Sequence, residues 1–150
     1  MRSPVALPPN LDLMLASTLS HVSYPTRAAY DANTLELGLL LTYRNKQHQV
    51  QATASVLGDR ADASRPGGDR NGWRGSVQWY TALDAGLYAE AGLTHQHWHS
   101  AQWYAPGLID VARRQHTSQL LAAVQWYLVP RLSVQLEARL ARNRENISLF

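Results

Sequence analysis

Strict alternation of apolar and polar residues is the feature that most constrains how this chain can fold. Residues 75–97 read GSVQWYTALDAGLYAEAGLTHQH, with apolar residues at every second position on both sides of a turn at residues 83–86. Residues 120–142, LLAAVQWYLVPRLSVQLEARLAR, repeat this design around a turn at residues 129–131. A period of two belongs to a β-strand with one apolar and one polar face, so each stretch predicts a β-hairpin.

The same alternation predicts seven strands and the start of an eighth. The expected strands cover residues 11–20, 35–44, 50–56, 73–80, 87–98, 120–128 and 132–140, and residues 147–150 would begin the eighth. Short turns are expected at residues 45–48, 83–86 and 129–131. Long polar connections are expected at residues 22–33, 58–71 and 100–117, the second of them a mobile loop rich in Gly, Asp, Arg and Pro. Short turns at one end and long loops at the other are typical of an outer-membrane β-barrel.

Alternation alone does not say which face of the sheet is inside. A soluble up-and-down barrel such as a lipocalin would bury the apolar face, whereas an outer-membrane barrel would turn it toward lipid. The apolar face here is rich in Leu and Ala, and the whole chain has one Phe, which is a weak composition for filling a barrel interior. Together with the asymmetry of the connections, this favours the membrane barrel.

Composition narrows the classes of protein further. With 150 residues the chain suits a single β-barrel domain over residues 1–150, or a fragment of one. It has no Cys, and its net charge of +3 without a long Lys/Arg run gives little support to nucleic-acid binding. No apolar run approaches the roughly 18 residues that a spanning helix needs. Five Trp and seven Tyr favour rings with a polar group, which suit membrane–water boundaries.

The two faces of the predicted sheet supply the candidate functional residues. Trp79 and Trp126 fall on the apolar face beside short turns, where the inner aromatic girdle of a membrane barrel is expected. The polar face would then line the lumen. Its candidate residues are Arg74, Gln78, Glu90, Gln125, Glu137 and Arg139.

Closure of the sheet bears on whether the chain is complete. Unpaired backbone groups cost several kcal/mol each in hydrocarbon, so a sheet in lipid cannot leave its edges open. Seven strands and a stub of an eighth do not close well, and bacterial single-chain barrels have an even strand number. The N-terminal residues also show no export signal. We therefore expect the C-terminal part of a larger transmembrane barrel, truncated within its eighth strand.

The C-terminal hairpin also resembles a known family. It ends in the pattern NR-x-N-I-S-L-F, carried here by Asn143, Arg144, Asn146, Ile147, Ser148, Leu149 and Phe150. This pattern resembles the C-terminal porin-like barrel of surface lipoprotein assembly modifiers and related tetratricopeptide-repeat outer-membrane proteins, in which one more strand and a terminal aromatic residue follow. The resemblance covers the last half of the chain. It implies a cell outer-membrane location, transport of lipoproteins to the surface and no catalytic residues.

The histidines and the carboxylates offer two other kinds of site. His95, His97 and His99 alternate on one strand and could chelate a divalent metal, together with His116. Because no Cys or carboxylate accompanies them, a position at the outer rim is the favoured interpretation, and no metal site is predicted. Glu90 and Glu137 could form a paired-carboxylate site.

The favoured role of Glu90 and Glu137 is to neutralise the charges of Arg74 and Arg139 in a polar lumen, because an intramembrane charge needs a partner or water. The arginines expected on the long connections could contact lipopolysaccharide phosphates, although a solvated loop is the commoner explanation. They are Arg60, Arg65, Arg70, Arg113 and Arg114.

The sequence thus predicts an antiparallel up-and-down transmembrane β-barrel module for transport or translocation, with no enzymatic activity and no cofactor. Its expected partners are outer-membrane lipid, lipopolysaccharide and, through the resemblance, a lipoprotein cargo. Two alternatives stay open. One is a complete eight-stranded outer-membrane barrel acting as an adhesin or structural anchor, and the other is a soluble lipocalin-like ligand-binding barrel.

Overall fold

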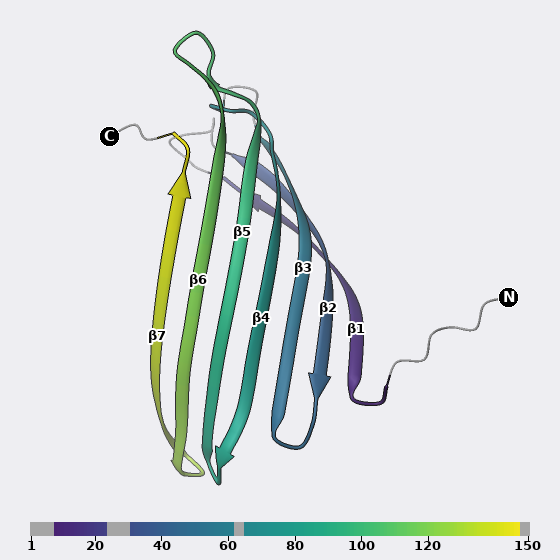
Figure 1. Cartoon of the computed structure of the whole chain (residues 1–150), viewed down its shortest axis with the longest axis vertical. Coiled ribbons are helices and arrows are strands. Elements are labelled where there is room, and N and C mark those ends of the chain that lie inside the picture. The colour runs from purple at the N-terminus through teal and green to yellow at the C-terminus, as the bar shows by residue number, and fades with distance from the viewer. Residues whose placement is uncertain (1–7, 24–30, 62–64, 148–150) are drawn as a thin grey trace, which may run out of the picture.

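The described residues form a single β-sheet (Figure 1). A computed structural model describes residues 8–23, 31–61 and 65–147. The strands are β1 (Leu11–Val22), β2 (Ala32–Arg44), β3 (His48–Ala61), β4 (Arg70–Asp84), β5 (Leu87–Ala105), β6 (Ile109–Val129) and β7 (Leu132–Glu145). All neighbouring strands are antiparallel and follow the order of the sequence, which confirms the predicted all-β, up-and-down arrangement.

The strand register joins the apolar stripes of all seven strands into one face. Residues that lie directly opposite each other on paired strands point to the same side of the sheet. Leu41 of β2 lies between Leu13 of β1 and Ala52 of β3, and the same rule holds across the rest of the sheet. One face is therefore apolar from β1 to β7, and the other carries the polar residues that alternate with it.

Local sequence chemistry sets the short turns. The side-chain Oδ1 of Asn45 accepts hydrogen bonds from the backbone N–H groups of Gln47 and His48, at 2.9 and 2.7 Å, and so closes the β2–β3 turn. Gly86 in the β4–β5 turn has a φ of +78°, and a Cβ there would lie 2.9 Å from the carbonyl oxygen of Tyr127. Only glycine suits that position. The three predicted short turns are confirmed.

The sheet is curved, and no second layer covers it in the described part of the chain (Figure 1). The only buried hydrophobic side chains among these residues are Ala32, Leu57 and Ala123. By contrast, Leu15 and Leu136 on the apolar face are 80% and 76% exposed. A soluble antiparallel sheet packs one face on a core. Among the described residues this apolar face has no such cover, and β1 and β7 each pair with one neighbouring strand.

Two of the predicted long connections are wrong in part, because strands continue through polar sequence. β3 extends to Ala61 and β4 begins at Arg70, so both ends of the predicted mobile loop at residues 58–71 belong to strands. β5 and β6 form one extended hairpin whose turn covers only residues 106–108, so most of the predicted 100–117 connection is strand. Backbone pairing continues there, with register shifts between His99 and Ala105.

Residues 148–150, most of the predicted eighth strand, lie outside the described residues.

Within residues 8–23, 31–61 and 65–147, the structure contains no helical segment with the length and hydropathy of a membrane span.

Candidate functional site

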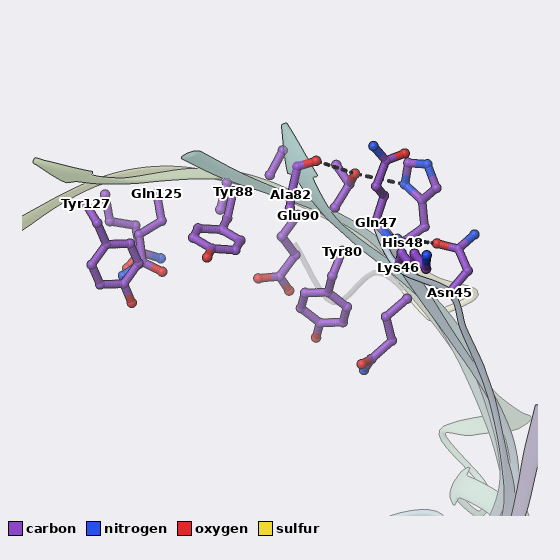
Figure 2. Close-up of a pocket in the computed structure, with 15 residues that line it drawn as sticks. Asn45, Lys46, Gln47, His48, Tyr80, Ala82, Tyr88, Glu90, Gln125 and Tyr127 are labelled. Carbon is purple, nitrogen blue, oxygen red and sulfur yellow. Dashed lines mark hydrogen bonds between the residues drawn. The ribbon is translucent and has the colours of Figure 1, made fainter. Parts of the chain in front are cut away.

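The concave face of the sheet carries all of the predicted lumen residues. Figure 2 shows Tyr80, Tyr88, Glu90, Gln125 and Tyr127 projecting from this side of the curved sheet. Register places the other predicted lumen residues on the same face, namely Arg74, Gln78, Glu137 and Arg139. The apolar face is consequently the convex one.

The short-turn end of the concave face is lined by tyrosine and amide side chains around a cavity of about 530 Å³ (Figure 2). The hydroxyl of Tyr80 donates a hydrogen bond to Oε1 of Gln78 at 3.1 Å, and Nε2 of Gln125 donates to the hydroxyl of Tyr127 at 3.0 Å. The Tyr88 and Tyr127 rings meet edge to face at 5.8 Å. This lining offers hydrogen bonds and ring faces to a hydrated solute.

Charged side chains pair across the middle of the concave face. Nη1 of Arg74 lies 2.9 Å from Oε2 of Glu36, and Nε of Arg74 donates to Oε1 of Gln96 at 3.0 Å. Arg139 forms an ion pair with Glu137 on its own strand. The sequence indicated Glu90 and Glu137 as the partners of the two arginines, so the role of Glu36 was missed. Its place on β2, at the same alternation as the other polar residues, was the available signal.

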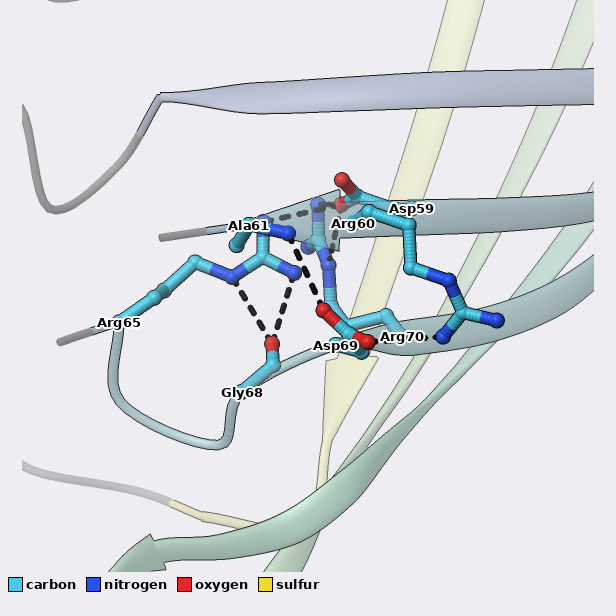
Figure 3. Close-up of polar contacts among 7 residues, drawn as sticks. All are labelled: Asp59, Arg60, Ala61, Arg65, Gly68, Asp69 and Arg70. Atoms are coloured by element: carbon cyan, nitrogen blue, oxygen red, sulfur yellow. Dashed lines mark hydrogen bonds and ion pairs between the residues drawn. The ribbon is translucent and has the colours of Figure 1, made fainter. Parts of the chain in front are cut away.

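At the opposite end of the concave face, two arginines hold one buried aspartate. The carboxylate of Asp59 is fully buried and accepts hydrogen bonds at Oδ2 from Nη1 of Arg65, at 3.1 Å, and from Nε of Arg70, at 2.8 Å. Nε and Nη2 of Arg65 also donate to the carbonyl oxygen of Gly68, at 2.9 and 2.7 Å (Figure 3). Oδ1 of Asp59 is buried and has no hydrogen-bond partner among the described residues. The cluster ties residues 65–70 to the end of β3.

A second ion pair fixes the connection that follows β3. Nη1 of Arg60 lies 2.8 Å from Oδ2 of Asp69, and the backbone N–H of Ala61 donates to Oδ1 of Asp69 at 3.1 Å (Figure 3). The hydrogen bond from Ala61, followed by the contact with Arg60, lowers the pKa of Asp69 below its ordinary value against the opposing effect of burial. The described part of this loop, residues 65–69, is therefore held by specific contacts.

The five arginines assigned to long connections take different positions. Arg65 and Arg70 bind Asp59, and the Arg65 side chain is only 7% exposed, so a merely solvated loop is the wrong explanation for it. Arg113 of β6 pairs with Glu145 of β7, with Nη2 2.9 Å from Oε2. Arg60 and Arg114 lie instead on the convex side of the sheet.

The predicted girdle residues Trp79 and Trp126 lie on the convex face near the short turns. They are 39% and 53% exposed, and the ring of Trp79 stacks with His48 at a centroid distance of 6.0 Å. Their position fits a girdle, and their contact with a membrane stays a prediction.

The histidines gather at the other end of the same face. The rings of His97 and His116 lie 4.3 Å apart, His95 and His116 lie 6.0 Å apart, and Nδ1 of His95 is 2.8 Å from Oγ of Ser118. Within residues 8–23, 31–61 and 65–147, no three or more His, Cys, Asp or Glu side chains are arranged to hold a metal ion. The position of His95, His97 and His99 at the outer rim of a barrel stays a prediction.

Comparison with protein-family models, with curated proteins and with solved structures finds no match to this chain. The fold and the two faces define the class: an all-β, up-and-down sheet with an exposed apolar face and a polar concave face.

Proposed function

We propose that this sheet forms part of the wall of an outer-membrane β-barrel. In this proposal the convex apolar face contacts lipid, and the concave polar face lines a water-filled passage used for transport or translocation. The observation that carries the proposal is the continuous face of exposed Leu, Val and Trp across all seven strands. Large exposed apolar surfaces mark sites that a membrane or a partner covers.

The direction of curvature favours the membrane barrel over the soluble alternative. A lipocalin-like barrel keeps its apolar residues on the concave, interior side. Here the concave side carries Arg74, Glu36, Glu90 and Glu137, with ion pairs at Arg74–Glu36 and Arg139–Glu137. Charges in a membrane protein face a water-filled interior and pair with one another.

The two edges of the sheet add a requirement. Each unpaired backbone N–H or C=O group costs several kcal/mol in hydrocarbon. The proposal therefore has β1 and β7 pairing with further strands, in the same polypeptide or in another copy, to close the barrel. The narrower proposal, in which the passage serves surface assembly of lipoproteins, is supported by the resemblance in the C-terminal hairpin. In the alternative of a complete small barrel acting as an adhesin or anchor, one eighth strand closes the sheet between β1 and β7.

Single-cysteine scanning of β7 tests the orientation of the faces, since the chain has no native Cys. The full chain carrying Val134→Cys, Leu136→Cys, Ser133→Cys or Gln135→Cys is reconstituted in lipid vesicles and labelled with an environment-sensitive fluorophore. We expect a lipid-soluble quencher to act on positions 134 and 136 and a water-soluble quencher to act on positions 133 and 135. Equal access of the water-soluble quencher to all four positions would show that the apolar face does not meet lipid.

A further inference from the structure

Three arginines on the convex face have no partner within the described part of the chain. Arg142 and Arg144 belong to β7 and Arg114 to β6, and all three are exposed. Their guanidinium groups make neither a hydrogen bond nor an ion pair with any described residue. Six other arginines do pair with a carboxylate, namely Arg60, Arg65, Arg70, Arg74, Arg113 and Arg139.

The strand register fixes the position of these arginines relative to the apolar residues. On β7, Arg142 and Arg144 follow Leu140 on the same face, one and two rows further along the strand. On β5, β6 and β7 the last apolar row consists of Leu93, Leu120 and Leu140, the next of His95, Ser118 and Arg142, and the next of His97, His116 and Arg144. Arg114 lies opposite His99 in the row beyond. We call Arg114, Arg142, Arg144, His97, His99 and His116 the basic rim.

The rim begins at the depth of lipid head groups if the apolar band spans the hydrocarbon. Two residues of a strand advance by roughly 6.6 Å, and a strand tilt of roughly 40° reduces this to about 5 Å along the membrane normal. Arg142 therefore lies about 5 Å beyond the Leu140 row, Arg144 about 10 Å and Arg114 about 15 Å. The polar layer of a bilayer extends roughly 5–8 Å from the edge of the hydrocarbon core, so Arg142 lies within it, and the long side chains of the other two arginines bind its outer edge.

Nearby carboxylates do not neutralise the rim. Glu145 faces the concave side, where it pairs with Arg113. Asp69 is bound by Arg60. The hydrogen bond of 2.6 Å from the backbone N–H of Gly107 to Oδ1 of Asp110 holds that carboxylate toward the β5–β6 turn, four residues along the strand from Arg114. Like charges gathered on one strand face repel one another. An anionic ligand bound between these side chains attracts each of them and so offsets their repulsion.

We propose that the basic rim binds phosphate groups of membrane lipids in the leaflet at the β5–β6 turn end of the sheet. This inference rests on the proposed function, in which the convex face meets lipid. Guanidinium groups recognise phosphate oxygens in a bidentate manner. Because the three arginines of the rim lie on two strands and in three rows, a lipid with two phosphate groups fits it best. Trp73, whose ring lies 5.2 Å from that of His95, adds an aromatic ring at the same level.

Energy transfer from tryptophan to a labelled lipid tests this assignment. The full chain is reconstituted in phosphatidylcholine vesicles containing a small fraction of dansyl-labelled bisphosphorylated lipid A, and transfer above that of random mixing measures enrichment around the protein. We expect enrichment of the wild-type protein to fall by roughly fivefold for each arginine changed in R114Q, R142Q and R144Q. The triple variant should approach random mixing.

A matched control removes three positive charges from the other end of the sheet. R44Q, K46Q and R131Q together lower the net charge by the same amount near the short turns, and this variant should keep the enrichment. Equal loss in both triple variants would overturn the proposal, because net charge alone would then explain the binding. Loss of wild-type enrichment at an inorganic phosphate concentration equal to that of the labelled lipid would also overturn it, because a lipid concentrated in the bilayer should outcompete the same amount of free anion.

Resistance to alkaline extraction from plain phosphatidylcholine vesicles separates the two proposals. A protein that inserts but shows no enrichment contradicts only the phosphate-binding rim. A protein that is released by alkali contradicts the membrane wall, and with it the rim.

Discussion

Arg74 on β4 and Glu36 on β2 form an ion pair across the intervening strand β3, with 2.9 Å between Nη1 and Oε2. The same guanidinium group donates to Gln96 on β5. One side chain therefore links β2, β4 and β5 on the concave face. Such a contact across a whole strand is helped by curvature, because side chains on the concave side of a sheet converge.

Removal of this pair should cost a modest amount of stability. We expect a double-mutant cycle of R74Q and E36Q to give a coupling energy of about 1 kcal/mol, since both side chains are only partly exposed. The measurement is the free energy of urea unfolding of the full chain from lipid vesicles. A coupling energy indistinguishable from zero would show that the two charges are separately solvated.

A charge placed at the centre of the convex face should be far more costly than the same charge one residue away. Leu136→Arg should destabilise the protein in vesicles by about 2–4 kcal/mol, because Leu136 is the middle residue of the apolar stripe on β7. The control Gln135→Arg lies on the concave face and should change stability by about 0.5 kcal/mol or less. Equal costs for the two variants would contradict an apolar environment at Leu136.

Two glycines of the β3–β4 pair should respond differently to alanine. A Cβ at Gly72 would collide with the carbonyl oxygen of His97 and lie 2.9 Å from the Trp98 ring, so Gly72→Ala should destabilise by about 1–3 kcal/mol. At Gly58 the only atom near an added Cβ is Oδ1 of Asn71, at 3.9 Å. Gly58→Ala should therefore be neutral or slightly stabilising. Unfolding in denaturant measures both, and a larger loss for Gly58→Ala would contradict the described packing.

Acid should release the contact between Asp69 and the end of β3. Because the folded pKa of Asp69 lies below its ordinary value, ionised Asp69 stabilises the fold above that ordinary value, and this stability is lost as the pH falls through the lowered pKa. Asp69→Asn should consequently lower the thermal midpoint at pH 7 but have little effect at about pH 2. An equal difference between variant and wild type at both pH values would exclude an ionic role for Asp69.

The sequence predicted the part of the fold that carries the two-residue alternation. Leu120, Val124 and Leu136 share one face as expected, and the short turns fall where Asn45 and Gly86 occur. In an amphipathic strand the alternation itself determines which residues share a face, so these features follow from local sequence.

Beyond the apolar band this local signal disappears. Residues 99–117 carry polar side chains on both faces, so β5 and β6 continue there without an alternation that could reveal them. Backbone pairing alone sustains the strands. The burial of Asp59 by Arg65 and Arg70 was equally hidden, because it depends on the return of the chain after β3. The composition of a polar segment between strands therefore does not predict which of its side chains contact one another.

The β5–β6 hairpin outreaches its neighbour β7, whose last partner on β6 is Gln115 (Figure 1). At its tip, Gly107 has a φ of +83° and open space around an added Cβ. A short epitope grafted at this position would stand clear of the strand ladder. Binding of an antibody to this epitope on intact cells would show which side of the envelope this end of the molecule occupies.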